Sequence, residues 1–227
     1  MGPKVRHPPH PSLRLHAATC RTRGGPAAEA LCHRLARLAS VGDPAARTFL
    51  ITGGVRSGKS WYAEQLVAGL TGPVSYVATG PQPGPDDPEW SARIAEHRSR
   101  RPADWSTVET LDLATTLVNA PGPVLIDCFG TWLTAVIDEL DGWDRPVLQW
   151  KPDFDLRFAR VLTAWRSSSR PIVAVSNEVG WGVVPAYRSG RVFADLLGEV
   201  NRSIADVSDR LVLMVAGRPL VIPDERQ

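Results

Sequence analysis

Short apolar runs alternate with segments of helical periodicity from Thr48 onward. Apolar runs bounded by turn residues are typical of strands buried on both faces. They predict strands over residues 48–51, 74–78, 124–127, 171–175 and 210–215, with 219–222 as a short hairpin partner of the last. The intervening patterns predict helices over residues 61–70, 89–101, 130–140 and 192–205. This order predicts an α/β fold, with a mostly parallel sheet, helices on both faces and ligands bound at the carboxyl ends of the strands.

Residues 1–47 differ in composition from the rest of the chain. They hold prolines at positions 3, 8, 9 and 11 with scattered arginine and histidine, followed by a short helical pattern over 27–38. The composition fits a disordered or non-essential segment better than an arginine-rich targeting segment or an over-long translation start. We expect residues 1–47 to be an N-terminal appendage and residues 48–227 to form one α/β domain.

Charge and hydropathy indicate neither a nucleic-acid nor a membrane partner. The net charge is +2 over 227 residues, which is too small to favour binding to polyanions. No stretch approaches the roughly 18 consecutive apolar residues of a membrane span, and the N-terminus lacks the apolar core of a signal peptide. We therefore expect a cytoplasmic protein. Cys20, Cys32 and Cys128 fit no zinc-binding spacing, which favours buried or incidental thiols.

Residues 53–60 match the G-x-x-x-x-G-K-[ST] pattern of a phosphate-binding loop. They read Gly53, Gly54, Val55, Arg56, Ser57, Gly58, Lys59 and Ser60. In such a loop, backbone N–H groups surround a phosphate, the lysine reaches the β- and γ-phosphate oxygens, and the hydroxyl ligates Mg²⁺. The alternative is a Gly/Ser-rich turn with a chance lysine. The strand predicted before the loop and the helix predicted after it favour nucleotide binding.

Asp127 closes an apolar strand that follows the phosphate loop in the chain. A carboxylate at this place holds Mg²⁺ in many nucleotide-binding folds. Asp127 could alternatively cap the helix that begins near Gly130, since aspartate is a favoured N-cap residue. We prefer the first interpretation, so Ser60 and Asp127 are the candidate ligands of Mg²⁺.

A polar helix predicted over 89–101 carries His97 among several arginines. A helix of this charge is usually a solvated surface. However, arginines hold anionic phosphates through charge-assisted hydrogen bonds, and a neutral imidazole beside a nucleotide can act as general base or nucleophile. The residues alone leave both interpretations open.

The segment from Ser176 to Pro185 follows the fourth predicted strand, and two of its glycines flank Trp181. Loops at this edge of a sheet often cover a bound ligand. A rigid turn built around a packed tryptophan is an equally good interpretation.

Together these motifs resemble one family, the bifunctional adenosylcobinamide kinase / adenosylcobinamide-phosphate guanylyltransferases. The resemblance extends from Ile51 to about Ile222. The family's phosphate loop, Thr-Gly-Gly-x-Arg-Ser-Gly-Lys-Ser, is present at residues 52–60. Its other motifs are Tyr-Val-Ala-Thr at 76–79, Arg-Ile-x-x-His at 93–97, Trp-x-Thr-x-Glu at 105–109 and Ser-Asn-Glu-Val-Gly-x-Gly-Val-Val-Pro at 176–185.

The resemblance implies a RecA-like P-loop fold, a homotrimer and two reactions. One reaction phosphorylates adenosylcobinamide with GTP or ATP and Mg²⁺. The other transfers GMP from GTP, through a histidine intermediate, to give adenosylcobinamide-GDP in cobalamin biosynthesis. The resemblance makes His97 the guanylylated histidine and Lys59 the second catalytic residue. It also implies nucleotide binding by residues 53–60 and by Ala78, Thr79, Gly80, Arg98, Ser99, Arg100, Arg101, Glu109 and Asp127.

Two departures from the family pattern lie in the segment expected near the corrinoid. Trp181 stands where the family usually has methionine. Tyr187 lies in residues 185–188, which read Pro-Ala-Tyr-Arg where the family usually has Pro-Glu-Asn-Arg. Neither alters the phosphate loop or His97. A kinase that has lost guanylyl transfer is the main alternative. A nucleotide-dependent switch is disfavoured because the chain lacks an Asn/Thr-Lys-x-Asp guanine-recognition motif.

Overall fold

The computed structural model describes residues 46–81 and 87–224. The helical pattern over 27–38, Cys20 and Cys32 lie outside the described residues. Residues Arg47–Gln227 form one compact unit.

One sheet of seven strands organises the described part of the chain. The strands are β1 (Thr48–Gly53), β2 (Ser75–Ala78), β3 (Ser106–Glu109), β4 (Val124–Asp127), β5 (Ile172–Val175), β6 (Arg210–Val215) and β7 (Arg218–Ile222). Their spatial order is β3-β2-β4-β5-β1-β6-β7. Every neighbouring pair is parallel except β6 and β7, which form an antiparallel hairpin. The predicted mostly parallel sheet and its terminal hairpin are therefore confirmed.

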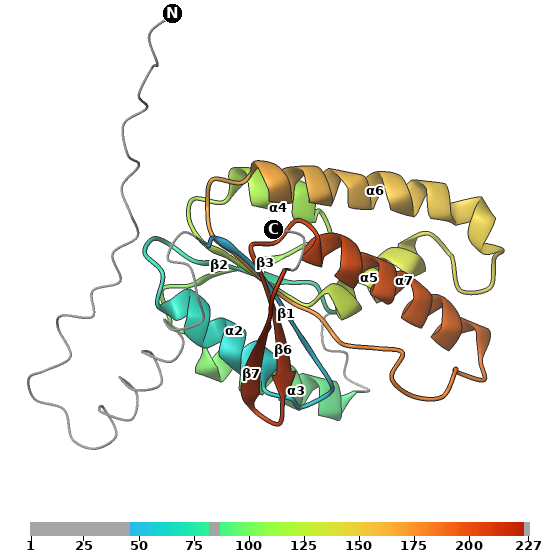
Figure 1. Ribbon diagram of the computed structural model, residues 1–227, viewed down its shortest axis with the longest axis horizontal. Coiled ribbons are helices and arrows are strands. Elements are labelled where there is room, and N and C mark those ends of the chain that lie inside the picture. The colour runs from blue at the N-terminus through green and yellow to red at the C-terminus, as the bar shows by residue number, and fades with distance from the viewer. Residues whose placement is uncertain (1–45, 82–86, 225–227) are drawn as a thin grey trace, which may run out of the picture. The chain divides into compact units, whose positions relative to one another are not determined.

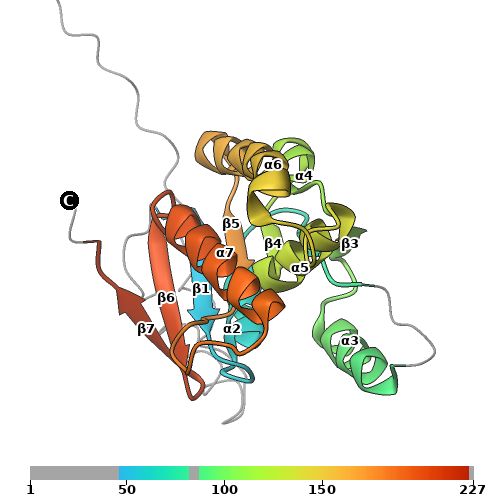
Figure 2. The same cartoon turned by 90° about the vertical axis from the view of Figure 1, so that its right-hand side faces the viewer.

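Helices cover both faces of this sheet, as the sequence predicts. They are α2 (Lys59–Ala68), α3 (Pro88–Arg100), α4 (Leu113–Asn119), α5 (Phe129–Glu139), α6 (Val147–Ser167) and α7 (Arg188–Ala205). Helix α2 packs against β1, β4 and β5, whereas α4, α5, α6 and α7 lie on the other side of the sheet (Figure 1). Figure 2 shows α3 standing apart from α4–α7, near the edge of the sheet formed by β3. No helix in the described ranges combines the length and the apolar character that crossing a membrane requires.

Three elements have no counterpart in the sequence pattern. Strand β3 lies at the sheet edge, and most of its residues are exposed. Since an exposed strand need not be apolar, its sequence shows no apolar run. Helix α4 is only seven residues long, and α6 contains Pro152, which interrupts a helical pattern. Helix α7 begins at Arg188, before the first residue that apolar periodicity predicts.

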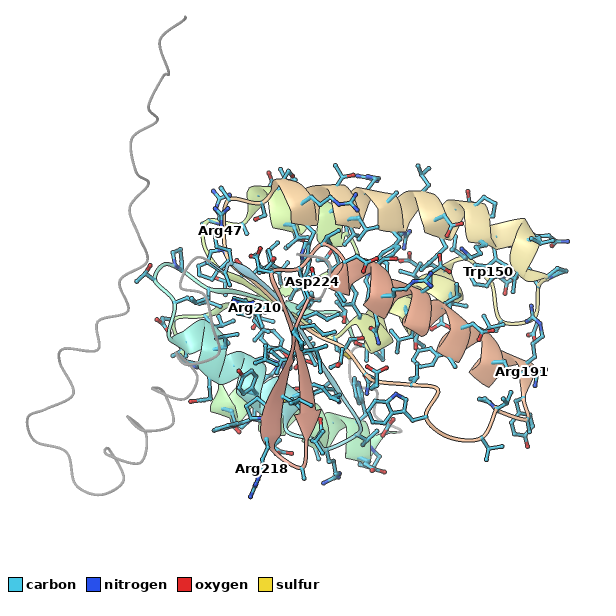
Figure 3. All side chains as sticks on the ribbon, viewed as in Figure 1. Arg47, Trp150, Arg191, Arg210, Arg218 and Asp224 are labelled. Carbon is cyan, nitrogen blue, oxygen red and sulfur yellow. The ribbon has the colours of Figure 1, made fainter. Side chains whose placement is uncertain are left out.

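Aromatic side chains fill the core between the sheet and helices α4–α7. Trp132 of α5 is fully buried, and its Nε1 donates to the carbonyl oxygen of Leu111 at 3.0 Å. Its ring meets Phe129 edge-on, with centroids 5.9 Å apart. Trp150 (Figure 3) and Trp165 anchor α6 over the same core. Since β1, β4 and β5 are also buried, their carboxyl ends form a rigid edge on which a site can be built.

Candidate active site

The phosphate loop joins β1 to α2 and requires glycine at both ends. Gly53 has φ of 151°, and a Cβ there would lie 2.7 Å from both the Met214 carbonyl oxygen and Ser57 Oγ. Gly58 has φ of 91° and is the N-cap residue of α2. Other residues rarely adopt these backbone angles. The loop therefore ends at the N-terminus of α2, where unpaired N–H groups favour bound phosphate.

Lys59 and Ser60 occupy the first turn of α2. Lys59 is only 6% exposed, and its Nζ donates to the Gly54 carbonyl oxygen at 3.0 Å. Ser60 Oγ donates to Asp127 Oδ1 at 3.3 Å. This hydrogen bond joins the start of α2 to the end of β4. The two proposed Mg²⁺ ligands, Ser60 and Asp127, therefore lie next to each other.

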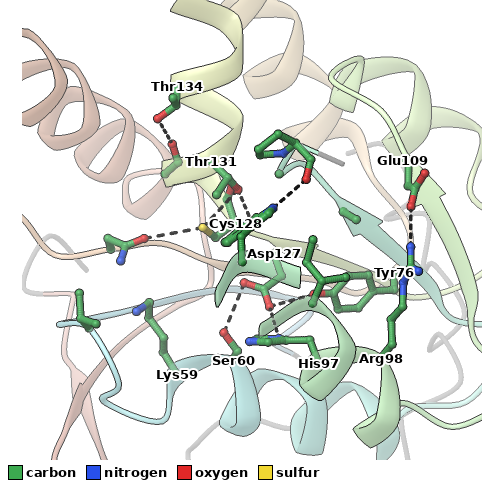
Figure 4. Close-up of a pocket in the computed structure, with 18 of the residues that line it drawn as sticks. Lys59, Ser60, Tyr76, His97, Arg98, Glu109, Asp127, Cys128, Thr131 and Thr134 are labelled. Carbon is green, nitrogen blue, oxygen red and sulfur yellow. Dashed lines mark hydrogen bonds and ion pairs between the residues drawn. The ribbon is translucent and has the colours of Figure 1, made fainter. Parts of the chain in front are cut away.

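Asp127 lies between the phosphate loop and β2. Its other oxygen, Oδ2, accepts a hydrogen bond from the Tyr76 hydroxyl at 3.0 Å (Figure 4). The N-cap of α5 is Cys128, so the alternative role of Asp127 as a helix cap is wrong. Hydroxyl and carboxylate oxygens are the ligands that Mg²⁺ prefers. Ser60 and Asp127 therefore fit a cation that also binds nucleotide phosphates.

His97 points from α3 toward this carboxylate and not into solvent. Its Nδ1 lies 3.5 Å from Asp127 Oδ2 and 3.7 Å from Glu64 Oε1, and its side chain is 19% exposed. Burial lowers the pKa of His97, although the charge of Asp127 opposes that shift. The lowered pKa favours the neutral imidazole, which has a free electron pair for use as base or nucleophile.

Glu64 of α2 holds the other side of His97. It is 4% exposed, and Arg100 donates to its two oxygens at 3.2 and 3.3 Å. Ligand atoms of Glu64, His97 and Asp127 all lie within 4.8 Å of one another, close enough for a metal ion to bind all three. The sequence pattern did not single out Glu64. A signal was present, because Ser60 and Glu64 are four residues apart and so share one face of α2.

A cavity of about 440 Å³ opens beside these groups. Its far wall contains the Arg98–Glu109 ion pair, at 3.0 Å, and the guanidinium of Arg101, which lies 3.2 Å from the centre of the Tyr76 ring. The sequence-predicted residues that line the cavity are Val55, Lys59, Ser60, Ala78, Gly80, His97, Arg98, Arg101, Glu109 and Asp127. Ten of the site residues predicted from the sequence therefore line a single cavity.

Three other candidate nucleotide-binding residues are directed elsewhere. Thr79 is buried, and its hydroxyl donates to the Cys128 carbonyl oxygen at 2.7 Å, linking β2 to β4. Ser99 donates to the carbonyl oxygen of Glu96, and Arg100 pairs with Glu64. Their side chains shape the site without lining the cavity.

The segment after β5 contributes a wall of the cavity through Asn177, Glu178 and Val179. Trp181 is 75% exposed, so the alternative of a turn built around a packed tryptophan is wrong. Cys128 follows β4 as a half-buried residue that also lines the cavity; burial raises the pKa of its thiol, which hydrogen bonds with Asn177. The expectation that this thiol is buried or incidental stays a prediction.

Comparison with known proteins identifies the family. A sequence profile described as cobinamide kinase / cobinamide phosphate guanyltransferase matches residues 49–222. A Pseudomonas aeruginosa protein, "Bifunctional adenosylcobalamin biosynthesis protein CobP", is 40% identical over 185 residues, which cover 78% of this chain and 97% of the relative. The corresponding CobU protein of Salmonella typhimurium is 35% identical over 178 residues, covering 74% of this chain and 95% of the relative.

Solved structures support the fold class independently. A prototypical ATPase from a bacterial type III secretion system aligns with a TM-score of 0.50 and 12% identity, over 74% of this chain and 50% of the ATPase. That likeness shows the P-loop ATPase fold alone. The sequence profile and the two relatives, each matched over nearly its whole length, show that this chain belongs to the cobinamide kinase / cobinamide phosphate guanyltransferase family.

Proposed function

We propose that this chain is a bifunctional enzyme that acts on adenosylcobinamide at one phosphate loop. It phosphorylates the substrate hydroxyl with a nucleoside triphosphate and then transfers GMP from GTP to the new phosphate, giving adenosylcobinamide-GDP. The observation that carries the proposal is the contact chain from Ser60 through Asp127 to His97, at 3.3 and 3.5 Å. It supports the proposal because the His97 imidazole lies beside the groups expected to hold a triphosphate.

Guanylyl transfer uses His97 as the nucleophile. Since Nδ1 faces Asp127 and Glu64, Nε2 is the nitrogen that attacks the α-phosphorus of GTP. The Nε2–P bond forms as the bond from the α-phosphorus to the bridging oxygen breaks, and pyrophosphate leaves. A phosphate oxygen of adenosylcobinamide phosphate then attacks the same phosphorus, and the N–P bond breaks.

The phosphoryl groups need positive charge and oriented donors. Lys59 and the N–H groups of residues 53–60 supply these, and Arg98 and Arg101 lie on the opposite wall of the cavity. Ser60 and Asp127 would hold Mg²⁺, which neutralises charge on the β- and γ-phosphates when bound. The donor for phosphorylation is a nucleoside triphosphate, ATP or GTP, while guanylyl transfer requires GTP.

Subunit assembly and cell location belong to the same proposal. We expect a cytoplasmic homotrimer in which α3 lies near a subunit boundary. Sedimentation or light scattering of the purified protein measures the assembly directly, and a monomer in solution would contradict it.

The decisive experiment incubates the purified protein with Mg²⁺ and GTP labelled at the α-phosphate. Covalent label on the protein, released by adenosylcobinamide phosphate, supports the two-reaction enzyme. Phosphorylation of adenosylcobinamide from γ-labelled nucleotide without any covalent label would favour the kinase-only alternative. Neither label nor phosphorylated product would overturn the proposal.

A further inference from the structure

Three carboxylates line the cavity, and they differ in what they contact. Asp127 is engaged by Ser60, Tyr76 and His97. Glu109 pairs with Arg98 at the far wall. Glu178 lines the same cavity, but among the described residues no arginine, lysine or histidine forms an ion pair with it. Two of the three carboxylates are thus engaged by charged groups, whereas the Glu178 carboxyl forms a hydrogen bond with the uncharged side chain of Thr52.

The topology of the sheet places Glu178 beside the phosphate loop. Strand β5 lies between β1 and β4, and Val175 is in register with both Ile51 and Asp127. Residues that follow Val175 therefore emerge between the phosphate loop and the proposed Mg²⁺ ligand. The backbone N–H of Glu178 donates to the Gly53 carbonyl oxygen at 3.1 Å. This bond holds Glu178 at the first glycine of the loop. The next residue, Gly54, accepts a hydrogen bond from Lys59, the side chain expected to reach the γ-phosphate.

The segment that carries Glu178 is fixed on its other side as well. Ser176 is fully buried, and its hydroxyl donates to Asn201 Oδ1 at 2.5 Å. Asn201 Nδ2 in turn donates to the carbonyl oxygen of Asn177 at 2.9 Å. Helix α7 therefore fixes the positions of the two residues before Glu178. These contacts hold the Glu178 carboxylate in a defined position at the cavity.

We propose that Glu178 is the general base of the phosphorylation step. The proposal rests on the kinase activity proposed above. The Glu178 carboxylate accepts the proton of the substrate hydroxyl as that oxygen bonds to the γ-phosphorus. The bond between the γ-phosphorus and the β–γ bridging oxygen breaks, and the nucleoside diphosphate leaves. The Glu178 carboxyl then releases its proton to water.

The surroundings of Glu178 suit this role. It is half-buried, and burial raises the pKa of its carboxyl, although a hydrogen bond with Thr52 opposes the shift. A carboxylate of raised basicity is a better proton acceptor than an ordinary surface glutamate.

Only one of the two reactions requires such a base. The attacking groups in guanylyl transfer are a neutral imidazole and a phosphate oxygen, and neither has to lose a proton to form its bond. The substrate hydroxyl of the kinase step does. A change confined to the Glu178 carboxylate should therefore separate the two activities.

The test compares Glu178→Gln and Glu178→Asp in the full-length protein. Both reactions are measured: phosphorylation of adenosylcobinamide from γ-labelled nucleotide, and covalent labelling from α-labelled GTP. Glu178→Gln should lower the kcat for phosphorylation about 10²- to 10⁴-fold, the usual contribution of a general base. Glu178→Asp should recover at least about tenfold of that loss because it retains a carboxylate.

Covalent labelling by GTP shows whether each variant still folds and binds nucleotide. It should stay within about threefold of the wild-type rate in both variants. Glu139→Gln is the matched control, since Glu139 is exposed and pairs with Arg157 on the surface. This control should leave phosphorylation unchanged.

Three results would overturn the assignment of Glu178. They are phosphorylation by Glu178→Gln within about threefold of wild type, no recovery with Glu178→Asp, or equal loss of covalent labelling. Absence of phosphorylation by the unaltered protein is a different failure, because it would contradict the proposed kinase activity itself.

Discussion

Nδ1 of His97 lies 3.5 Å from Oδ2 of Asp127, so a residue of α3 meets the carboxylate that ends β4. The other oxygen of Asp127 accepts a hydrogen bond from Ser60, in the first turn after the phosphate loop. The proposed nucleophile and the proposed metal site therefore share one side chain. A nucleotide bound at the loop would bring its phosphates to the same carboxylate that orients His97.

Glu64 should matter for guanylyl transfer through its contact with His97. Glu64→Gln removes the charge that lies 3.7 Å from Nδ1 and weakens the pairing with Arg100. We expect covalent labelling from α-labelled GTP to slow about tenfold, equivalent to ~1.4 kcal/mol. Phosphorylation should change less, since Glu64 is not among the described residues that line the cavity.

Glu96→Gln is the matched control for that experiment. Glu96 also pairs with Arg100, but its side chain is 70% exposed and lacks the His97 contact. Exposed ion pairs of this kind contribute little to the free energy of folding. Labelling should remain near the wild-type rate. Equal slowing in the two variants would assign the effect to Arg100 and not to the orientation of His97.

Much of the site could be predicted from sequence because its residues lie in motifs with a local mechanism. The phosphate loop is recognisable from its glycines and from Lys59 and Ser60, since one loop and one helix start supply the whole cradle. Asp127 is recognisable because it ends an apolar run. These signals depend only on neighbours along the chain, and the structure places the corresponding side chains together.

Other parts of the site depend on contacts that the sequence does not display. Glu64 looks like a polar helix residue until α3 places His97 and Arg100 against it. The exposed edge strand β3 carries Glu109 to the cavity although it has no apolar pattern. Strand order decides which loop lies beside the phosphate loop, and only the observed β4-β5-β1 order brings Glu178 there.

Trp132 should be a major source of stability. It is fully buried, packs against Phe129 and donates a hydrogen bond to Leu111. Trp132→Ala should lower the free energy of unfolding by about 3–5 kcal/mol, through the cavity left behind and the unpaired carbonyl group. Urea denaturation followed by circular dichroism measures the change. Trp181→Ala is the control, because that side chain is 75% exposed, and its effect should stay within about 0.5 kcal/mol.

A shortened protein that begins at Ala45 should keep the fold and both activities. The start of β1 is held by Asp209, whose Oδ2 accepts hydrogen bonds from the N–H groups of Arg47 and Thr48 at 2.7 and 2.9 Å. These contacts remain after the truncation. Circular dichroism and the two activity assays compare the shortened protein with the full chain. Insolubility or loss of activity would give residues 1–44 a structural or assembly role.

His97→Asn should remove the covalent adduct and spare phosphorylation. Asparagine keeps a polar side chain next to Asp127 but lacks a ring nitrogen able to form a phosphoramidate. In the wild-type protein, label from α-labelled GTP should resist alkali and be released by mild acid, as a phosphoramidate is, which separates it from a serine or threonine ester. The variant should carry no label, yet it should phosphorylate adenosylcobinamide, because the phosphate loop still holds the donor and direct transfer needs no histidine. Label that persists in His97→Asn would place the nucleophile on another residue.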